Sequence, residues 1–299
     1  MKEQRDSPKQ VIYVLGAGAT QAEVAYQGGE KVNLLMKDSP LFGEGISTRV
    51  LKKARENKLF DAANKGEIDI EKLISLLSAT GIEKGRRQAE KLRQFYYEEI
   101  LDGLTKSGLL NKPELSIGLL EMHKNGLLSE KVEKLTGIIS LNHDNLFQVA
   151  SQTVHGCIFL GFKFKSKQGL FKDDRKAPLI IKPHGSFDWR GASPIQVLGL
   201  KPKSKYSKNM LWIPPTILKE SKDYPYNKLS GLAYEALASK CNVLRIIGCS
   251  LSQNDWNMIS LLFNSQYGQN LRYGSCFRIE LIMGQRQGKG IKDEIRIRT

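Results

Sequence analysis

The chain has 299 residues, of which 40% are hydrophobic, and this is enough for one sizeable α/β domain that needs no disulfide bonds. Its four cysteines lie far apart without a C-x-x-C pair, its first ten residues are polar, and it has no apolar run of membrane-spanning length. These features predict a cytoplasmic protein without a zinc ribbon or membrane segment, while the net charge of +15 favours an anionic ligand, nucleic acid or an acidic partner.

The first predicted element is a buried strand over residues 11–15, followed by the turn Gly16-Ala17-Gly18-Ala19-Thr20. Glycine at 16 permits a tight turn, and glycine at 18 lets the phosphates of a ligand approach the backbone. A helix that opens near Thr20 would direct its N–H groups at them. Gln21 stands where the full dinucleotide fingerprint has a third glycine. The pattern therefore indicates either a nucleotide-binding turn or only a compact strand-to-helix turn.

A long helical stretch follows. After a short helix ending near residue 27 and an irregular segment to residue 46, apolar residues recur at helical spacing, and residues 86–104 predict a charged amphipathic helix. Shorter helices are predicted over 115–123 and 127–135. Ordinary connections between neighbouring strands are far shorter than this. We therefore expect a helical insertion over about residues 46–134, lying above the carboxyl ends of the strands.

The remaining strands are predicted over residues 136–141, 177–182, 242–248 and 277–283, with helices over 145–152 and 229–240 between them. Apolar, non-alternating strands that are separated by helices are typical of a parallel sheet covered on both faces. The sequence predicts an α/β fold with a doubly wound, mostly parallel, Rossmann-like sheet. We expect one domain over residues 1–299, with its core in 10–45 and 135–285.

Polar residues stand at the carboxyl ends of these strands. The second strand ends in Ser140-Leu141-Asn142-His143-Asp144, the third in Pro183-His184-Gly185-Ser186, and the fourth in Gly248-Cys249-Ser250. One of Asn142 and Asp144 is explained as a cap of the next helix, and His184 alone could be an ordinary loop residue. Because the carboxyl ends of parallel strands meet at one edge, we expect these side chains to converge on a nucleotide site.

The order of these motifs resembles that of the sirtuins. Residues 182–189, together with 247–251 and the following Asp255, are most similar to the bacterial sirtuin-like NAD hydrolases of anti-phage defence. The resemblance covers about residues 10–260. It implies that Asn142 and Asp144 hold the nicotinamide ribose or a water and that His184 is the catalytic base. It also implies that the dinucleotide is bound by Gly16, Ala17, Gly18, Ala19, Thr20, Ser140, Gly248 and Ser250.

Three departures separate this chain from the protein deacetylases of that family. It has neither the paired C-x-x-C motifs of the zinc ribbon nor a Gly-Ile-Pro-x-Phe-Arg run, and Leu141 replaces a glutamine. The resemblance therefore implies an NAD+ hydrolase without a metal, which releases nicotinamide and ADP-ribose as the toxic effector of an abortive-infection system. An ADP-ribosyltransferase, or a non-catalytic nucleotide-sensing or nucleic-acid-binding module, remains an alternative.

The resemblance further implies control by self-assembly or by a partner such as a HerA-type ATPase or an Argonaute. Phe95, Tyr96 and Tyr97 are candidate anchors of a homo-oligomer interface, unless they pack within the chain. Residues 151–210 carry 12 basic and 3 acidic residues. This basic segment is either a solvated lysine-rich surface or a groove for the phosphates of nucleic acid.

Overall fold

The centre of the molecule is a five-stranded, all-parallel sheet. The computed structural model describes residues 8–27, 32–59, 69–127, 133–191, 194–216, 223–249 and 256–282. In spatial order, the strands are β4 (Leu179–Ile181), β2 (Glu133–Ser140), β1 (Lys9–Leu15), β8 (Val243–Ile247) and β9 (Arg278–Ile282). The chain builds outward from β1 first to one side and then to the other, so the predicted doubly wound, Rossmann-like fold is confirmed.

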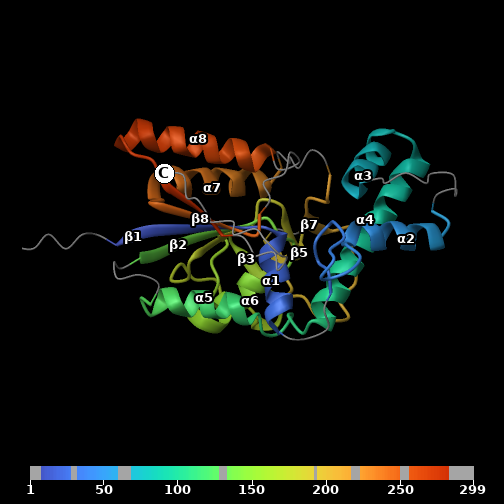
Figure 1. Ribbon diagram of the computed structural model, residues 1–299, viewed down its shortest axis with the longest axis horizontal. Helices are drawn as coiled ribbons and strands as arrows, with labels where there is room; N and C mark the ends of the chain where they lie inside the picture. Colours follow the sequence, from blue (N-terminus) through green and yellow to red (C-terminus); the bar gives the residue numbers. More distant parts are fainter. Residues whose placement is uncertain are drawn as a thin grey trace, which may run out of the picture.

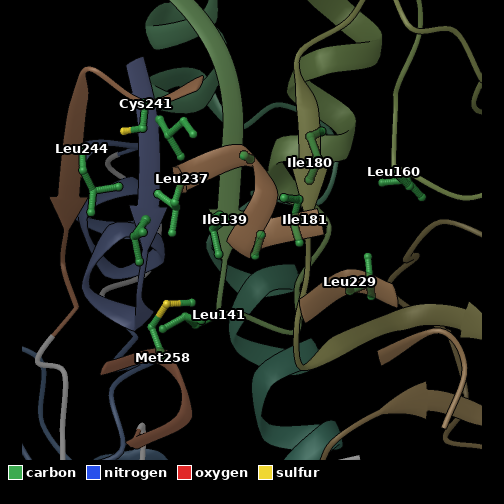
Figure 2. Packing of buried hydrophobic residues seen from close by; sticks show 14 of the residues in the cluster. Ile139, Leu141, Leu160, Ile180, Ile181, Leu229, Leu237, Cys241, Leu244 and Met258 are labelled. Atoms are coloured by element: carbon green, nitrogen blue, oxygen red, sulfur yellow. The ribbon is translucent and has the colours of Figure 1, made fainter. Parts of the chain in front are cut away.

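Helices cover both faces of this sheet (Figure 1). One layer contains α1 (Ala17–Gln27), α5 (Glu114–Lys124) and α6 (Leu146–His155), and the other contains α7 (Tyr226–Lys240) and α8 (Trp256–Tyr273). Successive side chains of β1 point to opposite faces, so Tyr13 packs in the cluster with α5 and α6, and Ile12 packs in the cluster with α7 and α8. Figure 2 shows Ile139 and Ile181 of neighbouring strands beside Leu237 of α7. Burial on both faces explains why the strands are apolar without alternation.

A second sheet lies beside the main one and was not predicted. It has four strands in the order β3 (Phe164–Ser166), β6 (Ile195–Val197), β5 (Gly185–Arg190) and β7 (Met210–Trp212). Three of these strands have only three residues, which is too short to show a period. In β5, Ser186 and Asp188 alternate with Phe187 and Trp189 at the period of a strand, but the polar side chains are buried as well as the apolar ones.

The helical insertion is built on this second sheet. Helices α2 (Ile46–Glu56), α3 (Ile70–Ala79) and α4 (Glu83–Lys106) share one apolar cluster, which also contains Phe187 of β5 and Trp212 of β7. Helix α5 instead packs on the main sheet through Leu120. Within the predicted insertion of residues 46–134, the helices that form a separate layer are therefore α2, α3 and α4, which lie at one end of the molecule (Figure 1).

Most predicted element boundaries agree with the structure to within a few residues, and one prediction is wrong. The helix predicted over 127–135 is contradicted at Glu133–Leu135, which belong to β2 and pair with Lys9–Val11 of β1. Residues 128–132 lie outside the described part of the chain. Pairing with the central strand outweighs the weak helical pattern of this stretch. Among the described helices, none combines the length and apolarity needed to cross a membrane.

Candidate functional site

The turn after β1 touches the end of β8, which is where the strand order reverses. Gly16 N–H donates to the carbonyl of Ile247 at 3.0 Å, and Gly18 N–H donates to the carbonyl of Gly248 at 2.8 Å. A Cβ on Gly16 would lie 2.6 Å from Cα of Cys249, and one on Gly18 would lie 2.7 Å from Cα of Gly248. Both glycines are therefore required by the close approach of the two backbones.

The backbone N–H groups that make these hydrogen bonds belong to the turn that the sequence predicts to bind the phosphates of a ligand. Ala19 N–H also has an acceptor inside the protein, the carbonyl of Gly16 at 2.9 Å. A phosphate that bound Gly18 N–H would have to displace the carbonyl of Gly248. Ala17 is the first residue of α1, so the positive end of the helix dipole does face this edge of the sheet. Ser250 lies outside the described residues.

Thr20 joins the two polar turns by hydrogen bonds. Its hydroxyl donates to Oδ2 of Asp144 at 2.8 Å and accepts from Nδ2 of Asn142 at 2.9 Å. The same Asn142 amide nitrogen donates to the carbonyl of Gly16 at 2.9 Å. Residues more than 120 positions apart in sequence thus form one hydrogen-bonded group at the carboxyl edge of β1 and β2. It contains an amide, a hydroxyl and a carboxylate.

Asp144 also caps the helix that follows it. Its Oδ1 accepts a hydrogen bond from the N–H of Leu146, the first residue of α6, at 3.1 Å. The capping interpretation therefore applies to Asp144, whereas Asn142 bonds across to the β1 turn. Ser140 is buried at the end of β2, opposite Leu15 of β1.

His184 follows β4 and reaches the same group of residues. Its Nδ1 lies 3.2 Å from the carbonyl oxygen of Leu141. A carbonyl only accepts hydrogen bonds, so Nδ1 of His184 carries a proton in this contact. The side chain is 7% exposed. Gly185 has φ +72°, and a Cβ there would lie 2.2 Å from the carbonyl oxygen of Leu211. A glycine at this position therefore leaves room for the backbone of β7, with which it pairs.

His143, to which sequence reasoning assigned no role, lies in an aromatic cluster. Its Nε2 is 2.9 Å from the carbonyl oxygen of Ile213, and its ring centroid is 5.1 Å from that of Phe187 and 5.2 Å from that of Trp212. Tyr96 of α4 stacks on Trp212 with a centroid distance of 5.9 Å. This cluster places α4 of the helical insertion against the turn that carries Asn142 and Asp144.

The aromatic residues of α4 belong to the interior. Phe95, Tyr96 and Tyr97 are 2%, 7% and 0% exposed and lie in the cluster that joins α2–α4 to the second sheet. Burial of the Tyr97 hydroxyl raises its pKa to about 12. The packing interpretation therefore holds for these residues, because buried side chains are not available to anchor an interface.

Lys182 and Asp188 are two buried titratable side chains that sequence reasoning also missed. Lys182 is 2% exposed, and its Nζ donates to the carbonyls of Asn142 and Asp144, each at 2.6 Å. Asp188 is 1% exposed and accepts from Nε2 of Gln148 at 3.2 Å. Burial lowers the pKa of Lys182 and raises that of Asp188, and the mutual attraction of the two groups opposes both shifts. A lysine directly after three apolar strand residues is the signal that could have identified it.

The lysines of the basic segment differ in their surroundings. Nine of them are exposed, unlike Lys182: Lys163, Lys165, Lys167, Lys172, Lys176, Lys201, Lys203, Lys205 and Lys208. Within the described parts of the chain, no group of three or more His, Cys, Asp or Glu side chains is arranged to hold a metal ion.

No protein-family model matches this sequence, and no curated protein matches it either.

Proposed function

We propose that this protein is an NAD+ glycohydrolase, which cleaves the bond between nicotinamide and ribose and releases nicotinamide and ADP-ribose. The observation that supports this most is the hydrogen-bonded group of Asn142, Thr20 and Asp144, with His184 on the next strand. Its position at the carboxyl edge of a doubly wound sheet is where such folds bind nucleotides. The motif order that resembles the sirtuin-like NAD hydrolases supports the choice of NAD+.

The side chains have the chemistry that this reaction needs. Breaking the C1′–N bond leaves neutral nicotinamide and an oxocarbenium-like ribose, whose positive charge the carboxylate of Asp144 would stabilise. Water would then bond to C1′, and its proton would pass to Nε2 of His184. The Asn142 side chain would orient the ribose or the water. NAD+ is the substrate in this scheme, and no metal takes part.

The dinucleotide would lie over the β1 turn, with its pyrophosphate at the N-terminus of α1. Gly16, Ala17, Gly18, Ala19 and Thr20 form this turn. Gly248 and Ser250 would contact the adenosine half, and Ser140 would line the floor of the site. Binding through Gly18 N–H requires the peptide of Gly248 to move, because the two are now hydrogen-bonded.

The biological role that fits this activity is that of a cytoplasmic toxic effector in bacterial abortive infection. Uncontrolled cleavage of NAD+ would kill the cell, so the activity must be switched on by self-assembly or by a partner, such as a HerA-type ATPase or an Argonaute. These roles rest on the resemblance to the anti-phage NAD hydrolases.

Two alternatives start from the same site. An ADP-ribosyltransferase would share the cleavage step but transfer ADP-ribose to a protein instead of to water. A non-catalytic nucleotide-sensing or nucleic-acid-binding module would instead use the exposed lysines of the 151–210 segment.

The deciding experiment measures nicotinamide and ADP-ribose after incubation of the purified protein with NAD+. Asn142→Ala and His184→Ala should each lower the rate by about 100-fold or more, because one removes a positioning group and the other the proton acceptor. Asn125→Ala, at the exposed end of α5, is the matched control and should leave the rate unchanged. Each variant loses a hydrogen bond at the site, so melting curves must confirm that it is folded at the assay temperature.

The products separate the alternatives. Nicotinamide release with labelled ADP-ribose attached to protein would indicate a transferase. No nicotinamide release from wild-type protein, either alone or with its partner, would contradict the proposal and favour the binding module.

A further inference from the structure

The turn of residues 142–144 is held from the interior by the segment 182–187. Its three successive carbonyls all accept hydrogen bonds from this segment. Lys182 Nζ donates to those of Asn142 and Asp144 at 2.6 Å, and Phe187 N–H donates to that of His143 at 2.9 Å. The hydroxyl of Ser186 also donates to the carbonyls of His143 at 3.2 Å and Asp144 at 3.5 Å, so this segment supplies the partners of three carbonyls that have left the sheet ladder.

A lysine suits this position because one ammonium nitrogen carries several donors on a long, unbranched side chain. The carbonyls of Asn142 and Asp144 point toward this nitrogen, while the side chains of the same two residues bond to Thr20. The backbone of the turn is thus held on one side and its functional groups are presented on the other.

Stability alone does not account for the buried lysine. Removing a charge pair from water is costly, and well-packed apolar residues in its place are often as stabilising or more so. The ammonium of Lys182 is attracted by the buried carboxylates of Asp144 and Asp188, and Asp188 in turn accepts from Gln148. Burial of the Lys182 ammonium costs desolvation free energy, and this ammonium donates to two carbonyls of the candidate site. The combination points to a role for Lys182 at that site.

We infer that Lys182 is a positioning residue that sets the orientation of Asn142 and Asp144 by holding their carbonyls. This inference rests on the proposed function for its effect on catalysis, while its effect on the turn is independent of it. Lys182 itself is buried and does not touch substrate.

The test compares Lys182→Met with Asp188→Asn. The methionine keeps the length of the side chain but cannot donate, whereas the asparagine removes the partner charge and leaves the Lys182 donors in place. Lys182→Met should lower kcat by about 10- to 100-fold, with KM changed by less than about threefold, because the groups remain but are misplaced. Asp188→Asn should stay within about threefold of wild type in kcat.

Amide hydrogen exchange supplies a readout that does not depend on activity. The N–H groups of Phe187 and Leu146 bond to the carbonyl of His143 and the carboxylate of Asp144, so their exchange reports on the turn. Both should exchange faster in Lys182→Met than in Asp188→Asn. If wild-type protein does not cleave NAD+, the proposed function fails, but this comparison still decides whether Lys182 holds the turn.

A double variant covers the case in which Lys182→Met does not fold. Lys182→Met with Asp188→Asn removes the charge of Lys182 together with that of Asp188, and it leaves the carboxylate of Asp144 with its hydrogen bonds from Thr20 and from Leu146 N–H. We expect it to fold and to retain the loss of kcat and the faster exchange. Wild-type kcat and wild-type exchange in a folded double variant would overturn the inference, since Lys182 would then serve only to neutralise Asp188.

Discussion

Thr20 is the side chain through which the two polar turns of the site meet. Its hydroxyl accepts from Asn142 and donates to Asp144, a combination available to a hydroxyl but not to an ionised carboxylate. The residue is 7% exposed, so water cannot readily replace either hydrogen bond. Thr20 was expected to mark the start of a helix, and the structure assigns it a connecting role as well.

Replacing Thr20 by valine tests this role, since the two side chains have nearly the same shape. Thr20→Val should lower the free energy of unfolding by about 1–3 kcal/mol, because Asn142 and Asp144 each lose a buried partner. We also expect NAD+ cleavage to fall by about 10- to 100-fold, as for loss of a group that orients catalytic residues. Thr20→Ser, which keeps the hydroxyl, is the control for both measurements. Full activity in Thr20→Val would show that the connection is not needed for catalysis.

The β1 turn and the end of β8 form the contact that closes the sheet at the point where its order reverses. The spacing of Gly16 and Gly18 is explained by this contact, because a Cβ on either would collide with the backbone of residues 248 and 249. A glycine-rich turn after a buried strand therefore has two sufficient explanations in this fold, namely strand packing and phosphate binding.

Gly248 is the position where this contact tolerates least change. It has φ +57°, and a Cβ would lie 2.2 Å from the backbone nitrogen of Ala19. Gly248→Ala should cost about 1–3 kcal/mol of unfolding free energy for the backbone conformation alone, and more for the collision. Gly118→Ala in α5, where a Cβ meets nothing within 4 Å, should instead stabilise by about 0.5–1 kcal/mol. Denaturant titrations that gave both variants the same sign would contradict this account.

The outer surface of α8 carries several large apolar side chains that are exposed. Trp256, Phe263, Tyr267 and Leu271 recur at intervals of seven, four and four residues, and each is more than 60% exposed. The helix packs on α7 with its opposite side, which includes Met258 and Leu262. Because the aromatic residues of α4 are buried, this stripe on α8 is the better candidate surface for the proposed self-assembly.

Substitution of Phe263 and Tyr267 by serine tests that surface. We expect the double variant to lower the molecular mass measured by light scattering and to leave the melting temperature nearly unchanged, because exposed side chains contribute little to folding. Tyr26→Ser, at an aromatic residue that is 60% exposed on α1, is the control and should leave the mass unchanged. A wild-type protein that is monomeric at every concentration would contradict self-assembly itself.

The main sheet could be predicted from sequence because its inner strands lie between two helical layers, although the edge strand β9 is mostly exposed. Burial on both faces requires an uninterrupted apolar run, and such runs are visible in the linear chain, as at residues 11–15 and 243–247. The positions of Asn142, Asp144 and His184 could be predicted for the same reason, since each directly follows such a run.

The second sheet and the connections within the site could not be predicted in this way. Strands of three residues have no measurable period, and the residues of β5, which do alternate, are buried at polar as well as apolar positions. The Thr20 connection and the hold of Lys182 on the turn join residues about 40 to 124 positions apart. Such contacts depend on which strands become neighbours, and strand order arises from packing of the whole chain, which no local pattern of residues encodes.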